Sequence, residues 1–282
     1  LILREQGKLS LDDEITEYVD SITLSGLHLY KDQEYSSKLT ISNLLFQTSG
    51  LPDAFEEGKN PIKKRVLRED TPFTFEEMIT LTKQLKPHFP PNTMKRAHYA
   101  DINFDILGEI IKNITKSSLP DAFKSFIFTP LGLKMTYLPE SENDFVPNIY
   151  YKDTAISRPN FIKSCPASGG GITTARELMI FIKAFFGGKL FRKEDFHQLE
   201  KYNKLQTSMF PIQYGGGYMR IPLNGLPTLF MANGNLIGHS GSTGSFAFYF
   251  PEKDLFLVGD VNQWATPALP IRLAMRIAIS IK

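Results

Sequence analysis

The sequence is poor in cysteine, in net charge and in long apolar runs, and each shortage excludes a class of protein. A single cysteine, Cys165, excludes an internal disulfide and a metal site built from several thiolates. The 32 basic and 30 acidic residues give a net charge of +2, so no global field attracts nucleic acid. No apolar run approaches the roughly 18 residues of a membrane helix, and no membrane span is expected in this chain.

Several short motifs of well-characterised sites are also absent. No two histidines have the His-x-x-x-His spacing of a zinc-binding helix, so no metal site is expected. No cofactor is expected either. Gly-x-Ser-x-Gly does not occur, which excludes the nucleophile elbow of α/β-hydrolases. Four histidines are predicted to be structural or exposed: His28, His88, His98 and His197.

What is present is a chain of 282 residues, 42% apolar and 22% charged, which is enough for one large domain or two lobes. Apolar residues repeat with a nearly helical period over residues 103–113. Thr174 and Glu177 have the spacing of a capping box at the start of another helix. That helix is predicted over residues 174–186, and further helices over residues 40–47, 74–83, 119–128 and 267–282, with loops filling most of 56–86.

The pattern changes to that of strands after about residue 210. Segments rich in Ile, Val, Phe and Tyr, joined by short turns typical of antiparallel hairpins, occupy residues 212–221, 235–241, 244–250 and 255–261. We therefore predict an α+β fold with an antiparallel sheet flanked by helices and an inserted helical lobe. Residues 1–282 are assigned to a single domain, with the helical lobe over about 26–205 and the sheet-containing lobe over about 1–25 and 206–282.

Short segments follow one another in an order that one enzyme superfamily uses. They occupy residues 5–13, 44–52 with Thr-Ser-Gly-Leu-Pro, 99–108 with Tyr-Ala-Asp, 130–133, 169–178, and 239–241 with His-Ser-Gly. In these segments the chain resembles the serine β-lactamase and penicillin-binding-protein superfamily, in its class C and esterase-like branch. A single tripeptide would be weak evidence, but the ordered set spans nearly the whole chain. The resemblance implies a β-lactamase/transpeptidase-like fold.

The resemblance implies that Tyr99 is a catalytic tyrosine, which passes protons between the nucleophile and the leaving group. Such a tyrosine needs nearby cations that lower its pKa from about 10. Asp101 stands where the family more often has Asn, and its carboxylate would repel an anionic substrate more than an amide would. Taken alone, Tyr99 could instead pack a loop onto a helix. Asp101 could be a helix N-cap, which is compatible with a place in the active site.

The segment His239-Ser240-Gly241 corresponds to the Lys-Thr-Gly strand of the family, which supplies substrate contacts and an oxyanion donor. The match places that donor at the backbone N–H of Ser242. His239 replaces a permanent cation by a group that is mostly neutral at pH 7. The alternative for His239 is a strand histidine whose nitrogens are satisfied by a neighbour.

The family's nucleophile motif, Ser-x-x-Lys, occurs nowhere in these residues, because no lysine has a serine three positions before it. The resemblance places the serine and the lysine about ten and seven residues before Leu1, together with the first strands of the sheet. The sheet described by this chain is therefore expected to have a bare edge. Two explanations are open: the chain is part of a longer protein, which we favour, or it is a degenerate paralogue without a nucleophile.

The resemblance implies a serine acyl-transfer hydrolase that acts on ester or D-amino-acid amide bonds of a small molecule or peptidoglycan-like peptide. It also suggests an extracellular or cell-envelope location. Activity on β-lactams should be poor, because His239 and Asp101 do not provide the cation that normally holds the β-lactam carboxylate. Lower pH is expected to help anionic substrates by protonating His239. The alternative is an inactive, penicillin-binding-like module that binds without turnover.

Overall fold

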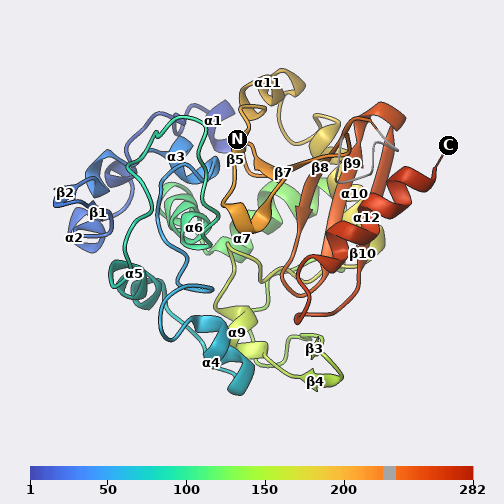
Figure 1. The fold of residues 1–282 in the computed structure, drawn as a ribbon, viewed down its shortest axis with the longest axis horizontal. Coiled ribbons are helices and arrows are strands. Elements are labelled where there is room, and N and C mark those ends of the chain that lie inside the picture. The colour runs from blue at the N-terminus through green and yellow to red at the C-terminus, as the bar shows by residue number, and fades with distance from the viewer. Residues whose placement is uncertain (225–232, 282) are drawn as a thin grey trace.

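An antiparallel sheet of six strands forms one side of the molecule, and short helices and loops form the other (Figure 1). The computed structural model describes residues 1–224 and 233–281. Across the sheet the strands follow in the order β10 (Leu255–Asp260), β9 (Ser245–Phe250), β8 (Asn235–Ser240), β7 (Met219–Pro222), β6 (Gln213–Tyr214) and β5 (Asn203–Lys204). Each strand pairs with the next in the chain, which confirms the predicted α+β fold with an antiparallel sheet.

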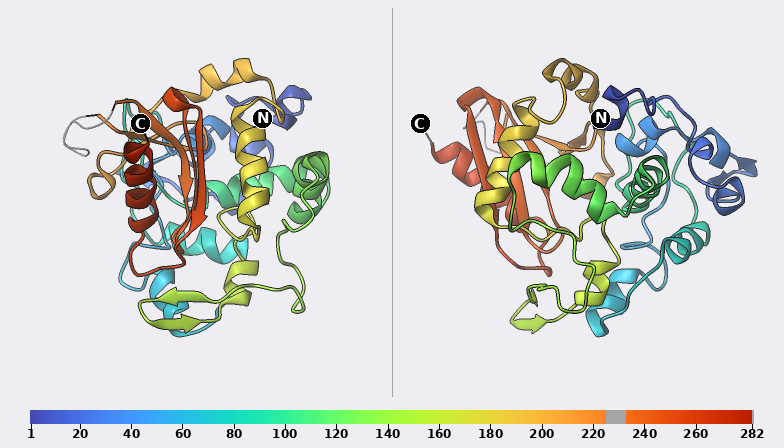
Figure 2. Two further views of the ribbon diagram at one scale, coloured as in Figure 1. Left: turned by 90° about the vertical axis from the view of Figure 1, so that its right-hand side faces the viewer. Right: turned by 180° about the vertical axis from the view of Figure 1, so that it is seen from behind.

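Alternating side chains of the sheet face two different helices, as the two-residue period of a strand requires. In β9, Phe246, Phe248 and Phe250 are buried in a core that includes Ala274 and Ala278 of α12 (Leu269–Ser280). Tyr249 points to the opposite face and packs against Phe186 of α10 (Ala175–Phe186). Figure 2 shows the sheet held between these two helices.

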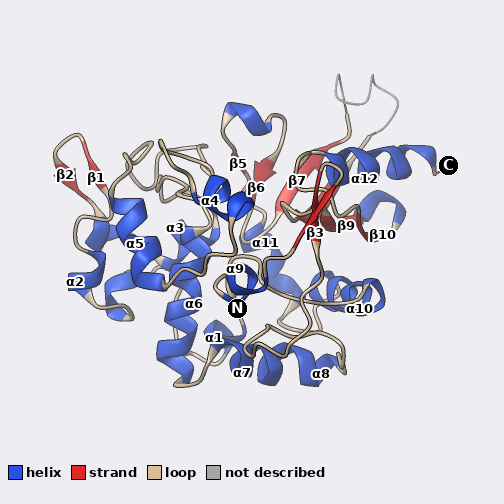
Figure 3. Cartoon of the chain, turned by 90° about the horizontal axis from the view of Figure 1, so that it is seen from below, coloured by secondary structure: helices blue, strands red, loops and turns tan. Residues whose placement is uncertain are grey.

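The helices on the other side pack around α6 (Ile102–Thr115) (Figure 3). Ile102, Ile106 and Ile110 are spaced four residues apart, so they share one helix face and are buried there. Their neighbours include α3 (Ile41–Leu45) and α5 (Phe75–Lys83). The remaining helices are α1 (Ile2–Glu5), α2 (Ser21–Leu24), α4 (Ile62–Arg68), α7 (Leu119–Phe123), α8 (Thr129–Leu131), α9 (Pro159–Lys163) and α11 (Phe196–Leu199).

Two small hairpins lie outside the main sheet, β1 (Leu29–Tyr30) with β2 (Gln33–Glu34), and β3 (Ile149–Tyr151) with β4 (Thr154–Ile156). Among the described residues, no helix is both long and apolar enough to span a bilayer.

Most predicted helices are confirmed, namely α3, α5, α6, α10 and α12. The predicted helix over residues 119–128 is divided, since α7 is followed by a π-helical turn from Lys124 to Phe128. Helix α4 was missed, because only Ile62 and Val66 of its residues are buried and the polar remainder reads as a loop. The bounds of the two lobes stay a prediction, and α10 lies on the sheet although its residues fall within 26–205.

Only one of the two hydrogen bonds of the predicted capping box at the start of α10 is present. The hydroxyl of Thr174 accepts a hydrogen bond from the Glu177 N–H, as predicted. The Glu177 carboxylate does not return to the Thr174 backbone; it accepts hydrogen bonds from the N–H groups of Lys134 and Met135. Glu177 therefore fastens the loop after α8 to α10, a long-range role that local spacing cannot reveal.

Candidate active site

A cavity of about 770 Å³ is lined by residues from both sides of the molecule. Its wall includes all the residues that the sequence predicted for the site: Tyr99, Asp101, His239, Ser240, Gly241 and Ser242. The fold thus brings two segments that are far apart in the sequence to one cavity, although their chemical roles stay predictions.

Tyr99 is placed by hydrogen bonds between the segment before α6 and the segment around β5. The N–H of Tyr99 donates to Oε1 of Gln206 at 3.1 Å. Two residues earlier, the N–H of Ala97 donates to the carbonyl of Lys204 at 2.8 Å. These two hydrogen bonds fix the backbone of residues 97–99 and so place the Tyr99 side chain at the cavity wall.

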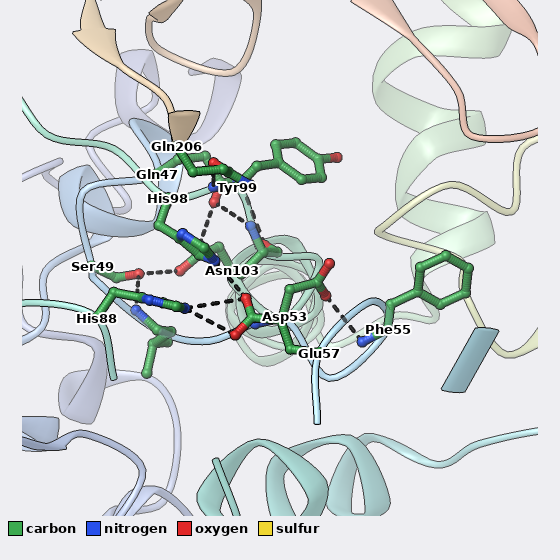
Figure 4. A network of polar contacts seen from close by, with 12 residues as sticks. Gln47, Ser49, Asp53, Phe55, Glu57, His88, His98, Tyr99, Asn103 and Gln206 are labelled. Carbon is green, nitrogen blue, oxygen red and sulfur yellow. Dashed lines mark hydrogen bonds and ion pairs between the residues drawn. The ribbon is translucent and has the colours of Figure 1, made fainter. Parts of the chain in front are cut away.

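A buried network of amide side chains fastens the Thr-Ser-Gly-Leu-Pro segment to the start of α6 (Figure 4). Oε1 of Gln47 accepts hydrogen bonds from the Ala100 N–H at 3.0 Å and from Nδ2 of Asn103. The Ser49 hydroxyl donates to Oδ1 of Asn103 at 2.8 Å. Gln47, Ser49 and Asn103 are each fully buried or nearly so. This segment therefore positions Tyr99 and Asp101, a role that the sequence reading did not assign to it.

Asn103→Ala is expected to lower the free energy of unfolding by about 2–3 kcal/mol, because it removes two buried hydrogen bonds and leaves the Ser49 hydroxyl without the acceptor to which it donates. Urea unfolding measures the loss. Asn113→Ala in the same helix is the matched control, since it removes one half-buried bond to the Tyr18 carbonyl and should lose about 1 kcal/mol or less. Equal losses in the two variants would contradict the special role of the network.

The charge around Tyr99 is negative, which reverses one expectation. Among the described residues, the cavity wall has no lysine or arginine, and it carries five carboxyl groups: Asp53, Glu56, Glu57, Asp101 and Asp105. Burial, and then the carboxylate of Asp101, raise the pKa of Tyr99 well above its ordinary value of 10.0. The expectation of a pKa lowered by cations is therefore wrong for the described part of the cavity, where Tyr99 is a neutral phenol.

Two of the carboxyl groups have pKa values near neutrality. Burial and the nearby charge of Asp105 raise the pKa of Asp101 to about 7. Burial likewise raises the pKa of Asp105 to about 7, although a hydrogen bond from Ser168 acts in the opposite direction. Asp101 stands at the N-cap position of α6, yet its side chain makes no capping hydrogen bond. Asp101 is therefore the N-cap residue of α6 by position, but its carboxyl does not cap the helix.

His239 is neutral and presents an acceptor. Its Nδ1 lies 2.9 Å from the Ser240 carbonyl oxygen, so Nδ1 carries the proton and donates it. Its buried Nε2 then holds a lone pair and has no hydrogen-bond partner within residues 1–224 and 233–281. Burial also lowers the pKa of His239. The alternative of a strand histidine whose nitrogens are satisfied by a neighbour therefore fails for Nε2.

The turn after β8 leaves a backbone donor available. The N–H of Gly241 donates to the Ser245 carbonyl at 2.8 Å, and the N–H of Gly244 donates to the Gly241 carbonyl at 3.1 Å. In the part of the chain that the structure describes, the Ser242 N–H has no acceptor. This geometry is compatible with the predicted oxyanion donor, which stays a prediction.

Comparison with known proteins identifies the family of the chain. The model of the family described as Beta-lactamase matches residues 1–280. The chain belongs to the beta-lactamase family. Protein flp of Staphylococcus aureus strain MW2 is 27% identical over 189 residues, which are 65% of this chain and 35% of that protein. The chain thus spans about a third of the length of this curated relative.

Solved structures of beta-lactamase-like proteins share the fold. A D-stereospecific amidohydrolase from Streptomyces sp. has a TM-score of 0.72 and 20% identity, covering 97% of this chain and 81% of that one. EstCE1, described as a hydrolase with promiscuous acyltransferase activity, has a TM-score of 0.74 and 18% identity, covering 97% and 80%. At such identities the likeness establishes the fold alone.

One cluster of possible metal ligands on the cavity wall was not predicted from the sequence. The side chains of Glu57, His88 and His98 meet there, with ligand atoms all within 4.8 Å of one another. Their spacing in the sequence follows no metal motif, because Glu57 comes from the loop before α4 and the two histidines come from the loop between α5 and α6. The one signal available was the position of His98, directly before the Tyr99 segment.

Proposed function

We propose that the protein is a serine acyl-transfer hydrolase that acts on ester or D-amino-acid amide bonds and prefers neutral or cationic substrates. The observation that carries the proposal is a single cavity lined by Tyr99 and by Ser240, Gly241 and Ser242. Membership of the beta-lactamase family supports the reaction class. Solved structures of an amidohydrolase and of the hydrolase EstCE1 support the choice of bonds by analogy.

The proposed reaction requires a Ser-x-x-Lys segment, supplied to this cavity from outside the 282 residues. The serine hydroxyl attacks the substrate carbonyl and its proton passes to the lysine. The N–H of Ser242 donates to the developing oxyanion. Tyr99 gives its phenolic proton to the leaving oxygen or nitrogen, and the lysine then returns a proton to Tyr99. The raised pKa of Tyr99 suits this role of acid, because the phenol is still protonated when the leaving group departs.

The 282-residue chain by itself is expected to form no covalent adduct with a β-lactam. Ser49 hydrogen-bonds to Asn103 in the buried network, and the sequence gives neither it nor Ser168, Ser240 or Ser242 a lysine three residues later. Mass spectrometry after incubation with penicillin checks this expectation. An adduct on any of these four serines would overturn the assignment of the nucleophile to an outside segment.

The alternative function is a penicillin-binding-like module that binds peptides without turnover. The absence of Ser-x-x-Lys from these residues is the observation that favours it. A fluorophosphonate label on the intact protein separates the two functions. Labelling of a serine in a Ser-x-x-Lys segment supports the hydrolase, whereas an unlabelled protein that still binds D-alanyl peptides supports the binding module.

A further inference from the structure

The Glu57–His88–His98 cluster has the donor set of a transition-metal site. Figure 4 shows both imidazole rings directed at the Glu57 carboxylate. Nε2 of His98 lies 2.6 Å from Oε1 of Glu57, and Nε2 of His88 lies 2.9 Å from Oε2. Two imidazole nitrogens and one carboxylate make up the protein ligands of many catalytic zinc ions, which keep a fourth position open.

The backbone around the cluster is fixed by the segment that ends at Gly50. The N–H of His98 donates to the Gln47 carbonyl at 2.9 Å, and the N–H of His88 donates to the Gly50 carbonyl at 2.8 Å. Gly50 has a φ of +76°, and a Cβ there would collide with the Phe89 carbonyl. Close approach of the two loops therefore depends on glycine, and it sets both histidines on the same side of Glu57.

The carboxylate itself is oriented by a further hydrogen bond. Oε1 of Glu57 accepts it from the Asp53 N–H at 3.2 Å. Hydrogen bonds from neighbouring groups to a metal ligand orient the ligand atom toward the metal. Glu57 and His88 are half-buried, with side chains 29% and 33% exposed, so an ion could reach them from the cavity that they line.

We propose that Glu57, His88 and His98 bind one divalent transition-metal ion, with zinc as the best fit, and leave a fourth coordination position open to the cavity. Imidazole and carboxylate ligands suit zinc, whereas calcium and magnesium prefer oxygen alone. The cavity wall has five carboxyl groups and no lysine or arginine among the described residues, and a dication would offset that charge. The proposal replaces the expectation of no metal.

Binding requires a small rearrangement. Ligand atoms around a tetrahedral zinc lie about 3.3 Å apart, given metal–ligand bonds of about 2.0–2.1 Å. The nitrogen–oxygen separations in the cluster are shorter than this, and the two rings are stacked with centroids 3.6 Å apart. The rings must therefore part as the ion enters. His88 is the ring able to move, since the His98 side chain is only 10% exposed.

Zinc titration of the full-length protein, stripped first with a chelator, tests the proposal. We expect one zinc per chain by calorimetry and by elemental analysis after dialysis. Glu57→Gln and His88→Ala should each weaken zinc binding by at least about 100-fold. Loss of a residue that only orients a metal ligand already costs up to about 100-fold in affinity, and loss of a ligand itself should cost no less. His197→Ala is the control, because that histidine is 86% exposed and lies near Glu200, far from a second histidine in the sequence.

Uptake well below one zinc per chain, or equal affinity in Glu57→Gln and the unmodified protein, would overturn the site. Cobalt substitution decides the question even if a variant fails to fold. The unmodified protein should give the intense visible bands of a four-coordinate cobalt site with nitrogen and oxygen ligands. The weak spectrum of six-coordinate aqueous cobalt would contradict the proposal. None of these readouts depends on hydrolase activity, so the site and the proposed function can fail separately.

Discussion

Replacement of Tyr99 by phenylalanine is expected to lower kcat of the intact enzyme by roughly 10²–10⁴, the usual contribution of a positioned general acid or base. The variant loses the phenolic proton but keeps the ring, which packs at centroid distances of 5.7 Å from Tyr214 and 5.6 Å from His239. Stability should therefore change little. Because the proton is transferred only in the transition state, kcat and kcat/KM should fall together. Steady-state hydrolysis of a p-nitrophenyl ester measures both.

Tyr214→Phe is the matched control for this experiment. It also removes a phenolic hydroxyl, but from a neighbouring ring that does not line the cavity. The buried oxygen of this ring has no hydrogen-bond partner among the described residues. Its activity should stay within a few-fold of the unmodified enzyme. If Tyr99→Phe is equally active, the proton carrier is a different group.

The intact enzyme is expected to hydrolyse a cationic ester about 100-fold more efficiently than an anionic one at pH 8. Two p-nitrophenyl esters of equal length, one ending in a quaternary ammonium group and one in a carboxylate, isolate the charge. Asp101 and Asp105, with pKa values of about 7, are mostly ionised at pH 8, and Nε2 of His239 offers only a lone pair. About tenfold is expected for each carboxylate that interacts with the substrate charge, since 1.4 kcal/mol corresponds to a factor of ten.

The pH dependence identifies the groups responsible. Below pH 7 the two carboxyl groups take up protons, so the preference for the cationic ester should shrink by pH 5.5. The sequence assigned this effect to protonation of His239. Burial lowers the pKa of the His239 ring, so the ring stays neutral over this pH range. We therefore expect the pH dependence of the preference to come from Asp101 and Asp105.

Asp105→Asn is the test of this assignment. At pH 8 the variant should lower the ratio of kcat/KM for the cationic ester to that for the anionic ester by about tenfold. At pH 5.5 the ratio should hardly change, because the native carboxyl is already protonated. Assays contain a chelator, because an ion at the Glu57–His88–His98 cluster would add positive charge to the same cavity. Equal kcat/KM for the two esters at pH 8 would show that the carboxyl groups do not select the substrate.

Local patterns in the sequence were sufficient for most of the secondary structure. Strand β9 was predictable because its side chains alternate between Phe in the core and other residues, and α6 because its isoleucines repeat every four residues. Helix α4 escaped because a short helix that buries two residues leaves almost no periodic signal. Interactions within one strand or helix repeat with its geometry, and such repeats are visible in a single sequence.

The sequence by itself determined the family, the antiparallel sheet and the segments that reach the cavity, because each depends on residue types at short, fixed spacings. Only the tertiary structure decided the charge of the site. The direction of the Tyr99 pKa, the neutral His239 with Nε2 as an acceptor, and the meeting of Glu57 with two histidines all depend on distances between separate loops. Electrostatic energies depend on separation and burial in space, and neither is written in the order of the residues.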